Sequence, residues 1–500
     1  MIDNHILGPV FIHLFTAILQ LIAWRKTVTQ RVISGIGSLL GVLVSIRLLH
    51  KVMQNGILTL NASNWESPFG IVFVADLLSS TLVLITSLAG LAVSLFSITG
   101  INRQRMLYGY FPIFHFLLMG LNGAFLTGDI FNLYVWFEVI IISSFVLMTL
   151  GGRKQQLEGA VKYMALNILA STFFLTGIGI LYGITGSLNL ADLSQKIKLV
   201  DNQFLIGITS SFFLLGFGIK SAVFPLYYWL PSSYHTPPSA VAATFGGLLT
   251  KVGIYAMLRV FSLIFIPDEF TRNLLMVLAV LTILTGSLGA IIKLNVRRLF
   301  SYLIVCHIGF MIGGIGMFSK IALMGTVFYL FHDILVKTNM FLIAGLIRHM
   351  RGTMELKYLG GIYKDYPKIS LLIALVLFSL VGIPPLSGFW PKIFLFKEAF
   401  NLAHYAFVGA LVLGSFVTLW VIARMWSEVF WKDVPEKEKI EDKYSPMPLA
   451  RKILLVLPIG ILAASTLFVG LNAEVIMKLV DQISNQLIDT SAYVKAVLGK

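Results

Sequence analysis

The stretch that decides the fold is KSAVFPLYYWLPSSYHTPPSAVAATFGGLLTK, residues 220–251, because it sets two lysines in apolar surroundings. Lys220 is the only charged residue in residues 204–230, and Lys251 is the only one in residues 238–258. Each segment is long enough to cross a bilayer, which takes about 20 residues as a helix. A lysine near mid-span costs about 2.5–3.5 kcal/mol on insertion scales, so both lysines are candidates for function.

Prolines separate the two lysines, at Pro225, Pro231, Pro237 and Pro238. Proline removes a helical hydrogen bond, and membrane-depth breaks are tolerated only where protein or water meets the freed backbone groups. The pattern predicts a broken helix beside an ionic half-channel, with Pro225 and Pro231 at the break. His235 lies in the same loop, where it either contacts an ion path or simply caps the loop.

The composition is that of an integral membrane protein. Of 500 residues, 57% are hydrophobic and 12% are charged, and the mean hydropathy is +0.87. The single cysteine, Cys306, excludes a disulfide framework and a cysteine-rich metal site. The net charge of +15 does not indicate nucleic acid binding, because the basic residues gather in short loops between apolar runs. We expect no metal site, and no soluble-enzyme motif such as HExxH or a P-loop occurs.

Apolar runs predict fourteen transmembrane helices. They are centred in residues 5–23, 32–50, 68–99, 108–127, 131–150, 161–183, 204–230, 239–262, 273–292, 299–317, 321–347, 369–396, 403–423 and 453–472. The loops after odd-numbered helices carry most of the loop lysines and arginines, for example Arg25, Lys26, Arg103, Arg105, Arg153, Lys154, Lys293, Arg297 and Arg298. The positive-inside rule therefore places these loops in the cytoplasm and both termini outside.

A second broken helix is predicted at residues 369–396. Pro384 and Pro385 fall in mid-span, and Lys392 is its only charge after residue 368. Predicted helices 7 and 12 are five apart, which fits two five-helix repeats, helices 4–8 and 9–13, and an odd number of helices inverts the second copy. The predicted domains are residues 1–107, residues 108–262, residues 263–430, and residues 431–500 with a cytoplasmic loop, helix 14 and an amphipathic tail on the membrane or against a partner.

Glu138 is the only charged residue in predicted helix 5, residues 131–150. Burial raises the pKa of a carboxylate and lowers that of a lysine, and a close opposite charge offsets both effects. A pair of Glu138 with Lys220 would therefore respond to the movement of one proton. The alternative is a static structural ion pair, although burying such a pair is a poor way to gain stability.

Two further lysines have a simpler alternative, in which the side chain reaches to the membrane surface. Lys251 lies far from either end of its helix and follows Gly246 and Gly247, so it is better placed to exchange protons. Lys392 lies nearer the end of its apolar run. Its place in a broken helix is what makes it a candidate.

Predicted helix 11 holds His332, Asp333 and Lys337. Asp333 and Lys337 are four residues apart and could simply neutralise each other. His332 points elsewhere and, like His307 in predicted helix 10, could relay protons or be a hydrogen-bonded packing residue. Less weight falls on Asp76, interpreted as a packing partner of a neighbouring helix or another protein chain, and on His5, His13, His115 and His404, which show no ligand spacing.

These motifs resemble a known family. The block FPLYYWLPSSYHTPPSAVAATFGGLLTKVGIYAMLR, the segment with Glu138, SYLIVCHIGF and GIPPLSGFWPK resemble the antiporter-like subunits shared by respiratory complex I and multisubunit cation/proton antiporters. SYHTPP followed by LLTKVGIYA looks most like the D-subunit family of Mrp-type sodium/proton antiporters. Lys392 stands where the complex I homologue closest in layout usually carries glutamate, which favours the Mrp group.

The resemblance implies a fourteen-helix, all-α membrane fold with inverted repeats, and a hydrated axis of Glu138, Lys220, Lys251, the histidines and Lys392. It implies a plasma-membrane transporter subunit with other membrane subunits as partners, H+ and Na+ as transported ions, and no quinone, nicotinamide or flavin cofactor. We therefore expect a proton-translocating antiporter subunit. The alternatives are a proton-pumping subunit of a complex I-type oxidoreductase and, from another class, a structural or quinone-site subunit of a redox enzyme.

Overall fold

The structure is a computed structural model that describes residues 5–435 and 442–499. The first four residues of the predicted N-terminal segment and residues 436–441 of the predicted cytoplasmic loop lie outside the described part. In the N-terminal half the main elements are α1 Gly8–Ile22, α2 Thr27–Asn55, β1 Leu58–Asn61, β2 Val72–Ala75, α3 Leu77–Gly100, α4 Arg103–Leu107, α5 Tyr110–Leu126, α6 Ile130–Thr149, α7 Lys154–Thr185, α8 Leu190–Lys196, α9 Gln203–Ser221, α10 Trp229–Ser233, α11 Ser239–Thr244 and α12 Thr250–Leu263.

The C-terminal half continues the same pattern of long apolar helices. Its main elements are α13 Glu269–Ile292, α14 Val296–Met317, α15 Lys320–Arg351, α16 Ile362–Asp365, α17 Pro367–Val381, α18 Phe389–Asn401, α19 Tyr405–Trp426, α20 Leu449–Leu471, α21 Ala473–Ile488 and α22 Ser491–Leu498. Within the described residues, 11 helices are long and apolar enough to cross a membrane, counting α11 and α12 as one. The shorter apolar helices α1, α5 and α17 complete the fourteen predicted spans.

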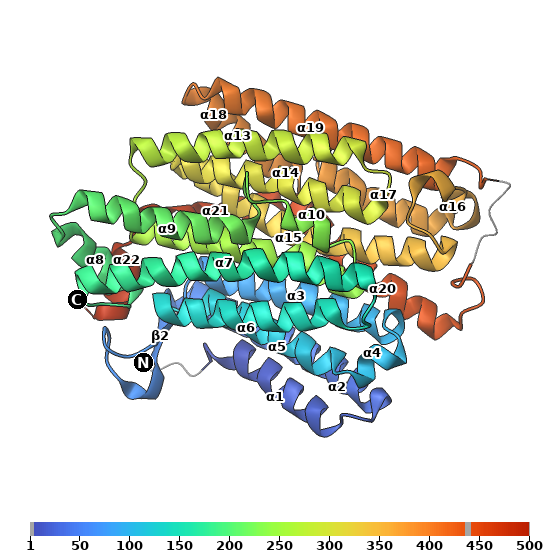
Figure 1. Ribbon diagram of the computed structural model, residues 1–500, viewed down its shortest axis with the longest axis horizontal. Helices are drawn as coiled ribbons and strands as arrows, with labels where there is room; N and C mark the ends of the chain where they lie inside the picture. Colours follow the sequence, from blue (N-terminus) through green and yellow to red (C-terminus); the bar gives the residue numbers. More distant parts are fainter. Residues whose placement is uncertain (1–4, 436–441, 500) are drawn as a thin grey trace.

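The long helices run side by side and form one bundle with two distinct ends (Figure 1). The short helices α4 and α16 lie at one end, and α8 and α22 lie at the other (Figure 1). Helices α1 and α2 form one edge of the bundle, and α18 and α19 form the opposite edge (Figure 1). The loops that follow odd-numbered predicted helices, with their basic residues, gather at the end that holds α4 and α16.

The third predicted span, residues 68–99, begins too early. Its first residues form β2, which pairs antiparallel with β1, and α3 begins only after Asp76. The run Val72–Ala75 is as apolar as a membrane span, but Pro68 and Gly70 precede it and its β-branched residues favour a strand. Asp76 accepts a hydrogen bond from the Ser79 backbone N–H at 2.8 Å, so it begins the helix and does not lie inside it.

Both predicted breaks are present, and both half-helices end in the same way. Helix α9 stops at Ser221 with left-handed Ala222, and α17 stops at Val381 with left-handed Gly382. The Val223 N–H donates to the Gly218 carbonyl at 2.9 Å, and the Ile383 N–H donates to the Phe378 carbonyl at 3.1 Å. This six-to-one hydrogen bond around a left-handed residue is a Schellman motif.

The two breaks have side chains that satisfy freed carbonyls. Trp229 Nε1 donates to the Ile219 carbonyl at 2.9 Å, and Lys392 Nζ donates to the Val381 carbonyl at 2.7 Å. Pro225 lies in the first break, whereas Pro231 lies within α10. Lys220 comes before its break and Lys392 comes after its break, so the two lysines do not occupy equivalent positions.

Helices α12 and α15 form the centre of the bundle. The apolar 18-residue stretches of α15 and of the span Ser239–Leu263, which contains α12, are 100% buried, in contrast to 39% for α2. The segment Phe245–Leu249, between α11 and α12, is a π-helical turn. Such turns widen the helix and leave carbonyls free for other donors, and they are frequent at functional sites.

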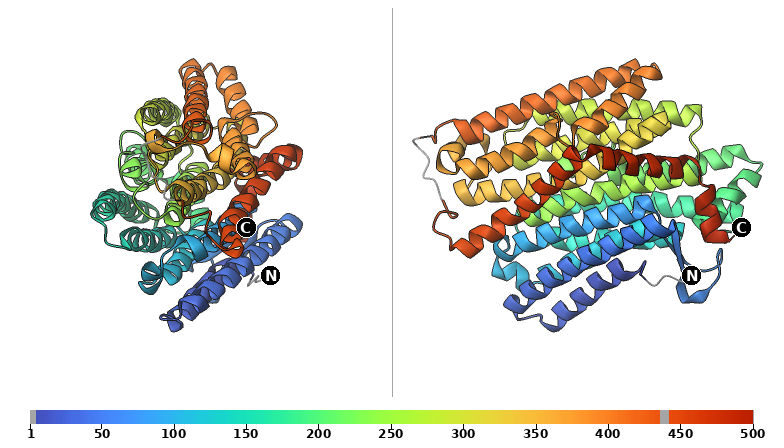
Figure 2. Two further views of the ribbon diagram at one scale, coloured as in Figure 1. Left: turned by 90° about the vertical axis from the view of Figure 1, so that its right-hand side faces the viewer. Right: turned by 180° about the vertical axis from the view of Figure 1, so that it is seen from behind.

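The C-terminal tail is an amphipathic helix, as predicted, but it packs against its own chain. Helix α21 contacts α15 and α12, and its buried face includes Val480, Ile483 and Leu487. Lys320 Nζ lies 2.7 Å from Asp481 Oδ1 and joins the start of α15 to α21. The red C-terminal helices therefore cover one side of the bundle (Figure 2).

Candidate functional site

A buried ion pair joins the two central helices. Lys251 Nζ of α12 lies 2.8 Å from Asp333 Oδ2 of α15, and both side chains are 0% exposed. The same ammonium donates a hydrogen bond to the Gly246 carbonyl at 2.7 Å, inside the π-helical turn. The widened turn thus supplies a second partner, a carbonyl oxygen, for the Lys251 ammonium, because a buried charge without hydrogen bonds is strongly unfavourable.

Asp333 does not neutralise Lys337, although the spacing of four residues allows it. The carboxylate faces α12 and α14, where it pairs with Lys251 and lies 3.5 Å from His307 Nδ1. The i, i+4 rule holds for exposed helix faces, and α15 is enclosed on all sides, so a neighbouring helix supplies the closer cation. Within the described residues, the Lys337 ammonium is buried without a hydrogen-bond partner.

The two candidate histidines both contact the Tyr329 ring. The ring centroids of His307 and His332 are 5.7 and 5.6 Å from that of Tyr329, both edge-on. His332 Nδ1 lies 2.8 Å from Ser387 Oγ, and Ser387 Oγ lies 2.9 Å from Ser379 Oγ. His332 therefore lies beside the second helix break, where Ser387 and Ser379 provide hydroxyl groups.

Lys392 turns toward the second break and not toward the membrane surface. Its Nζ bonds the last carbonyl of α17 and lies 5.8 Å from the centre of the Phe310 ring. The side chain also lines an apolar cavity of about 500 Å³ with Phe389 and Phe396. The Lys392 side chain therefore does not follow the alternative in which it simply extends to the surface.

The predicted contact between Glu138 and Lys220 is absent from the described structure. Lys220 Nζ donates to Asn167 Oδ1 at 3.0 Å and lies 5.5 Å from the centre of the Phe137 ring. Glu138 remains near, but one of its oxygens is buried without a hydrogen-bond partner in the described part. Asn167 lies on α7, which packs on α9, and its amide oxygen, rather than the Glu138 carboxylate, accepts the hydrogen bond from the Lys220 ammonium.

Asn167 is a functional candidate that the sequence pattern does not reveal. An uncharged amide in an apolar helix carries a weak signal, because its cost is small beside that of a charge. Its Nδ2 donates to the Tyr163 carbonyl at 2.8 Å, which fixes the side chain with Oδ1 toward Lys220. Asp333 is a similar case. Its spacing in the sequence points to Lys337 and gives no sign of its partner Lys251 on α12. The only available signal is that Asp333 is the one acidic residue of α15.

The loop after the first break borders a polar cavity of about 330 Å³. Its lining includes Pro231, His235, Glu158, Lys162 and Arg298. His235 Nδ1 lies 2.9 Å from the Pro231 carbonyl, which agrees with the capping alternative. Burial, followed by the nearby charge of Arg298, lowers the pKa of His235 to about 4, so the imidazole is neutral at pH 7.

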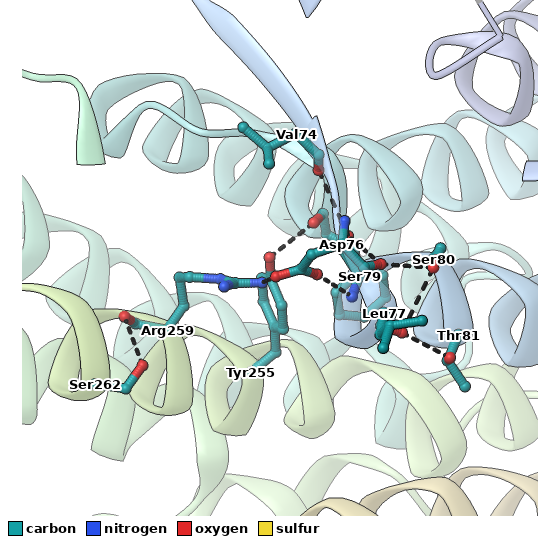
Figure 3. Close-up of polar contacts among 10 residues, drawn as sticks. Val74, Asp76, Leu77, Ser79, Ser80, Thr81, Tyr255, Arg259 and Ser262 are labelled. Atoms are coloured by element: carbon teal, nitrogen blue, oxygen red, sulfur yellow. Dashed lines mark hydrogen bonds and ion pairs between the residues drawn. The ribbon is translucent and has the colours of Figure 1, made fainter. Parts of the chain in front are cut away.

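A second buried ion pair lies toward the other end of α12. Arg259 Nη2 is 2.5 Å from Asp76 Oδ2, and the two side chains are 6% and 3% exposed. The guanidinium extends along the Tyr255 ring toward the start of α3, and the Tyr255 hydroxyl donates to the Phe125 carbonyl at 2.7 Å (Figure 3). Asp76 is expected from the sequence to be a packing partner of a neighbouring helix, and that helix is α12.

The N-terminal helices contain a histidine pair that no sequence motif indicates. His13 Nδ1 of α1 lies 3.1 Å from His115 Nδ1 of α5, and His115 Nε2 lies 3.0 Å from Ser34 Oγ. The wide separation of the two histidines in the sequence hides this contact. Within the described residues, no group of three or more His, Cys, Asp or Glu side chains could hold a metal ion.

With this geometry established, comparison with known proteins decides the family. Residues 127–418 match the family described as "NADH:quinone oxidoreductase/Mrp antiporter, TM". The chain belongs to this family. The D subunits of the Na(+)/H(+) antiporters of Alkalihalophilus pseudofirmus and Bacillus subtilis are each 39% identical to it, over 497 and 498 residues, and 99% of each chain is covered in both cases.

Two solved structures share the fold over the full chain. A chain of the Mrp complex from Dietzia sp. DQ12-45-1b has a TM-score of 0.90 and 27% identity, with 99% of both chains covered. A chain of the archaeal membrane-bound sulfane sulfur reductase has a TM-score of 0.87 and 25% identity at the same coverage. The predictions of the Mrp antiporter family, of an all-helical multi-pass membrane fold and of a transporter subunit are confirmed.

Replacing Asp76 with asparagine should destabilise the chain strongly, because Arg259 would be left buried without a counter-charge. Breaking a buried pair in this way costs about 3–5 kcal/mol. The measurement is thermal unfolding of the detergent-solubilised complex. Asp481→Asn is the matched control, since its pair with Lys320 is 39–45% exposed and such pairs contribute less than about 1 kcal/mol. Equal effects of the two substitutions would contradict a structural role for the Asp76 pair.

Proposed function

We propose that this chain is the proton-translocating D-type subunit of a multisubunit Na+/H+ antiporter. The observation that carries the proposal is the Lys251–Asp333 pair, beside which the buried Lys337 ammonium has no hydrogen-bond partner among the described residues. Further support comes from full-length relatives named as the D subunits of Na(+)/H(+) antiporters and from the fold shared with a chain of an Mrp complex. Intramembrane ionisable groups commonly mark proton relays.

The competition of two lysines for one carboxylate provides a proton-dependent switch. Lys251 holds Asp333 in the structure, while Lys337 lies one helical turn further along α15 with no hydrogen-bond partner in the described part. If Lys251 loses its proton, the attraction that holds Asp333 toward α12 disappears, and the carboxylate turns to Lys337. Each proton transfer thus changes which lysine is stabilised as a cation.

The remaining candidates extend this centre in both directions. Toward the first break the path runs through Lys220, with Glu138 near enough to respond to its charge. Toward the second break it runs through His307 and His332 to Lys392. We propose that protons enter beside Pro225, Pro231 and His235 through the polar cavity at that loop, and leave beside Pro384 and Pro385. The proline breaks supply free backbone groups that water can hydrate.

The assignment of repeats and partners belongs to the same proposal. Residues 108–262 and 263–430 form the two inverted repeats, a division supported by the identical Schellman motifs at the two breaks. Residues 1–107 and 431–500 flank them. The Na+ step is assigned to another protein of the complex, because the described residues bring together no cluster of acidic side chains suited to a bare cation.

A proton-pumping role in a redox complex is the second candidate. It is favoured by the fold shared with a chain of an archaeal respiratory complex and by a family that includes NADH:quinone oxidoreductases. Purification of the native complex separates the two candidates. Small membrane partners without flavin or iron-sulfur proteins support the antiporter, and co-purifying redox proteins support the pump.

Glu138→Gln or Lys220→Ala should abolish Na+-dependent proton movement while leaving the complex assembled, because each removes a charge that the path requires. The measurement is the response of a fluorescent pH probe in everted membrane vesicles after addition of Na+. Glu474→Gln is the control, since that carboxylate is exposed on α21 and, within the described residues, pairs with the exposed Lys478. Full transport by both assembled path variants would refute the proposed route.

Both termini are proposed to lie outside the cell membrane, with the α4 end of the bundle in the cytoplasm. Because Cys306 is buried, single cysteines introduced by Lys26→Cys and Lys495→Cys report topology with low background. A membrane-impermeant maleimide should label the position-495 variant on intact cells and the position-26 variant only after permeabilisation. The reverse pattern would invert the topology.

A further inference from the structure

A cavity of about 380 Å³ at the basic end of the bundle is lined by an unusual concentration of cations. We call it the arginine pocket, after Arg105, Arg153 and Arg348, and it also includes His349 and Lys443. Among the described residues that line it, none is acidic. The adjacent carboxylate of Asp442 is engaged elsewhere, since it accepts a hydrogen bond from the Tyr366 hydroxyl at 2.8 Å.

The three arginines come from different parts of the chain and are brought together by the fold. Arg105 lies on α4, Arg153 is the N-cap of α7, and Arg348 lies near the end of α15. The Arg105 Nε donates to the Leu150 carbonyl at 3.0 Å, which anchors that guanidinium at the cavity wall. Burial, followed by the charges of Arg153 and Arg348, lowers the pKa of Arg105, so the three side chains lie close enough to repel one another.

Two of these arginines have no partner that accounts for their position. Within the described residues, the side chains of Arg153 and Arg348 form no hydrogen bond or ion pair, although each is within electrostatic range of Arg105. Like charges gathered without a counter-ion are unfavourable. An anionic ligand would remove the repulsion among the arginines. It would also accept hydrogen bonds from the guanidinium groups of Arg153 and Arg348, which donate none within the described residues.

The other groups around the cavity suit a phosphate. Thr236, Ser239 and Asn102 line it and provide uncharged donors beside the guanidinium groups. Arginine binds phosphate oxygens through two parallel N–H donors, a geometry that a lysine cannot reproduce. Basic pockets between membrane helices on the cytoplasmic side are the usual sites for anionic phospholipid headgroups.

We propose that the arginine pocket binds a phosphate-bearing anion, either the headgroup of an anionic phospholipid or a soluble phosphate compound. Such a ligand would join α4, α7 and α15 to the loop Thr236–Ser239 that follows the first broken helix. The loop is already tied from its other side, because Arg297 Nη1 donates to the Pro237 carbonyl at 2.6 Å. Occupancy would therefore fix the position of the proline loop. This inference does not depend on the proton path.

The test measures the thermal midpoint of the assembled complex, purified in detergent without phosphate. Phosphatidylglycerol in mixed micelles and inorganic phosphate are added separately, and sodium chloride of equal ionic strength is the reference. A ligand that binds the folded state raises the midpoint. The Arg153→Gln, Arg348→Gln double variant should bind at least about tenfold more weakly, because it loses the hydrogen bonds that two charged groups would donate to the phosphate. Arg103→Gln, on α4 but outside the pocket, should respond like the wild type.

The pattern of responses also separates the two sources of phosphate. A rise with phosphatidylglycerol alone identifies a lipid headgroup, a rise with inorganic phosphate alone identifies a soluble ligand, and a rise with both identifies a site open to either. Arg348→Lys keeps the charge, so it serves if the double variant does not assemble, and it should also weaken the response. No rise above the chloride reference in the wild type, or an equal rise in the variants, would overturn the proposal.

Discussion

The ion pair between Lys251 and Asp333 is the interaction on which the centre of this membrane protein depends. Two charges enclosed by apolar helices are stable only when each compensates the other, and removing one leaves the other uncompensated. The pair therefore fixes how α12 lies against α15, the two helices that the rest of the bundle surrounds. The Asp76–Arg259 pair fixes the other end of α12 to the start of α3.

Charge compensation also explains why the site can respond to protons. A pair with one anion and one cation is neutral, but the neighbourhood of Asp333 contains a second lysine and a histidine. Moving one proton changes the balance among these groups far more than it would in water, because the interior screens charge poorly. The broken helices bring free carbonyls and hydroxyl groups to both sides of this centre, as seen at Val381 and Ser387.

The sequence predicted the parts of this architecture that carry a large energetic cost. A lone lysine in an apolar run and a proline in mid-span are expensive whatever surrounds them, so the fourteen spans, both helix breaks and most charged candidates could be named in advance. The partners could not, because they depend on which helix faces meet. Asn167 beside Lys220, Asp333 beside Lys251 and Arg259 beside Asp76 are contacts between residues 53 to 183 positions apart.

Local sequence patterns misled where contacts with distant segments of the chain determined the structure. The strand Val72–Ala75 is as apolar as a buried span, and its preceding Pro68 and Gly70 are a weaker signal than that apolar run, so its pairing with β1 decides its structure. The pairing of Asp333 with Lys337, which is one of the alternatives that the spacing allows, follows a rule for exposed helices, whereas α15 has no exposed face in mid-span. In both cases the deciding contact came from another segment of the chain, β1 or α12, which a local sequence pattern does not reveal.

The most direct test of the account replaces the central pair with apolar residues of similar volume, Lys251→Met together with Asp333→Leu. Such a replacement of a buried ion pair is often neutral or stabilising for the fold. The complex should assemble with normal thermal stability, but Na+-driven proton movement in everted vesicles should be lost. Assembly with full transport would show that the pair only holds the helices together, and would contradict the account.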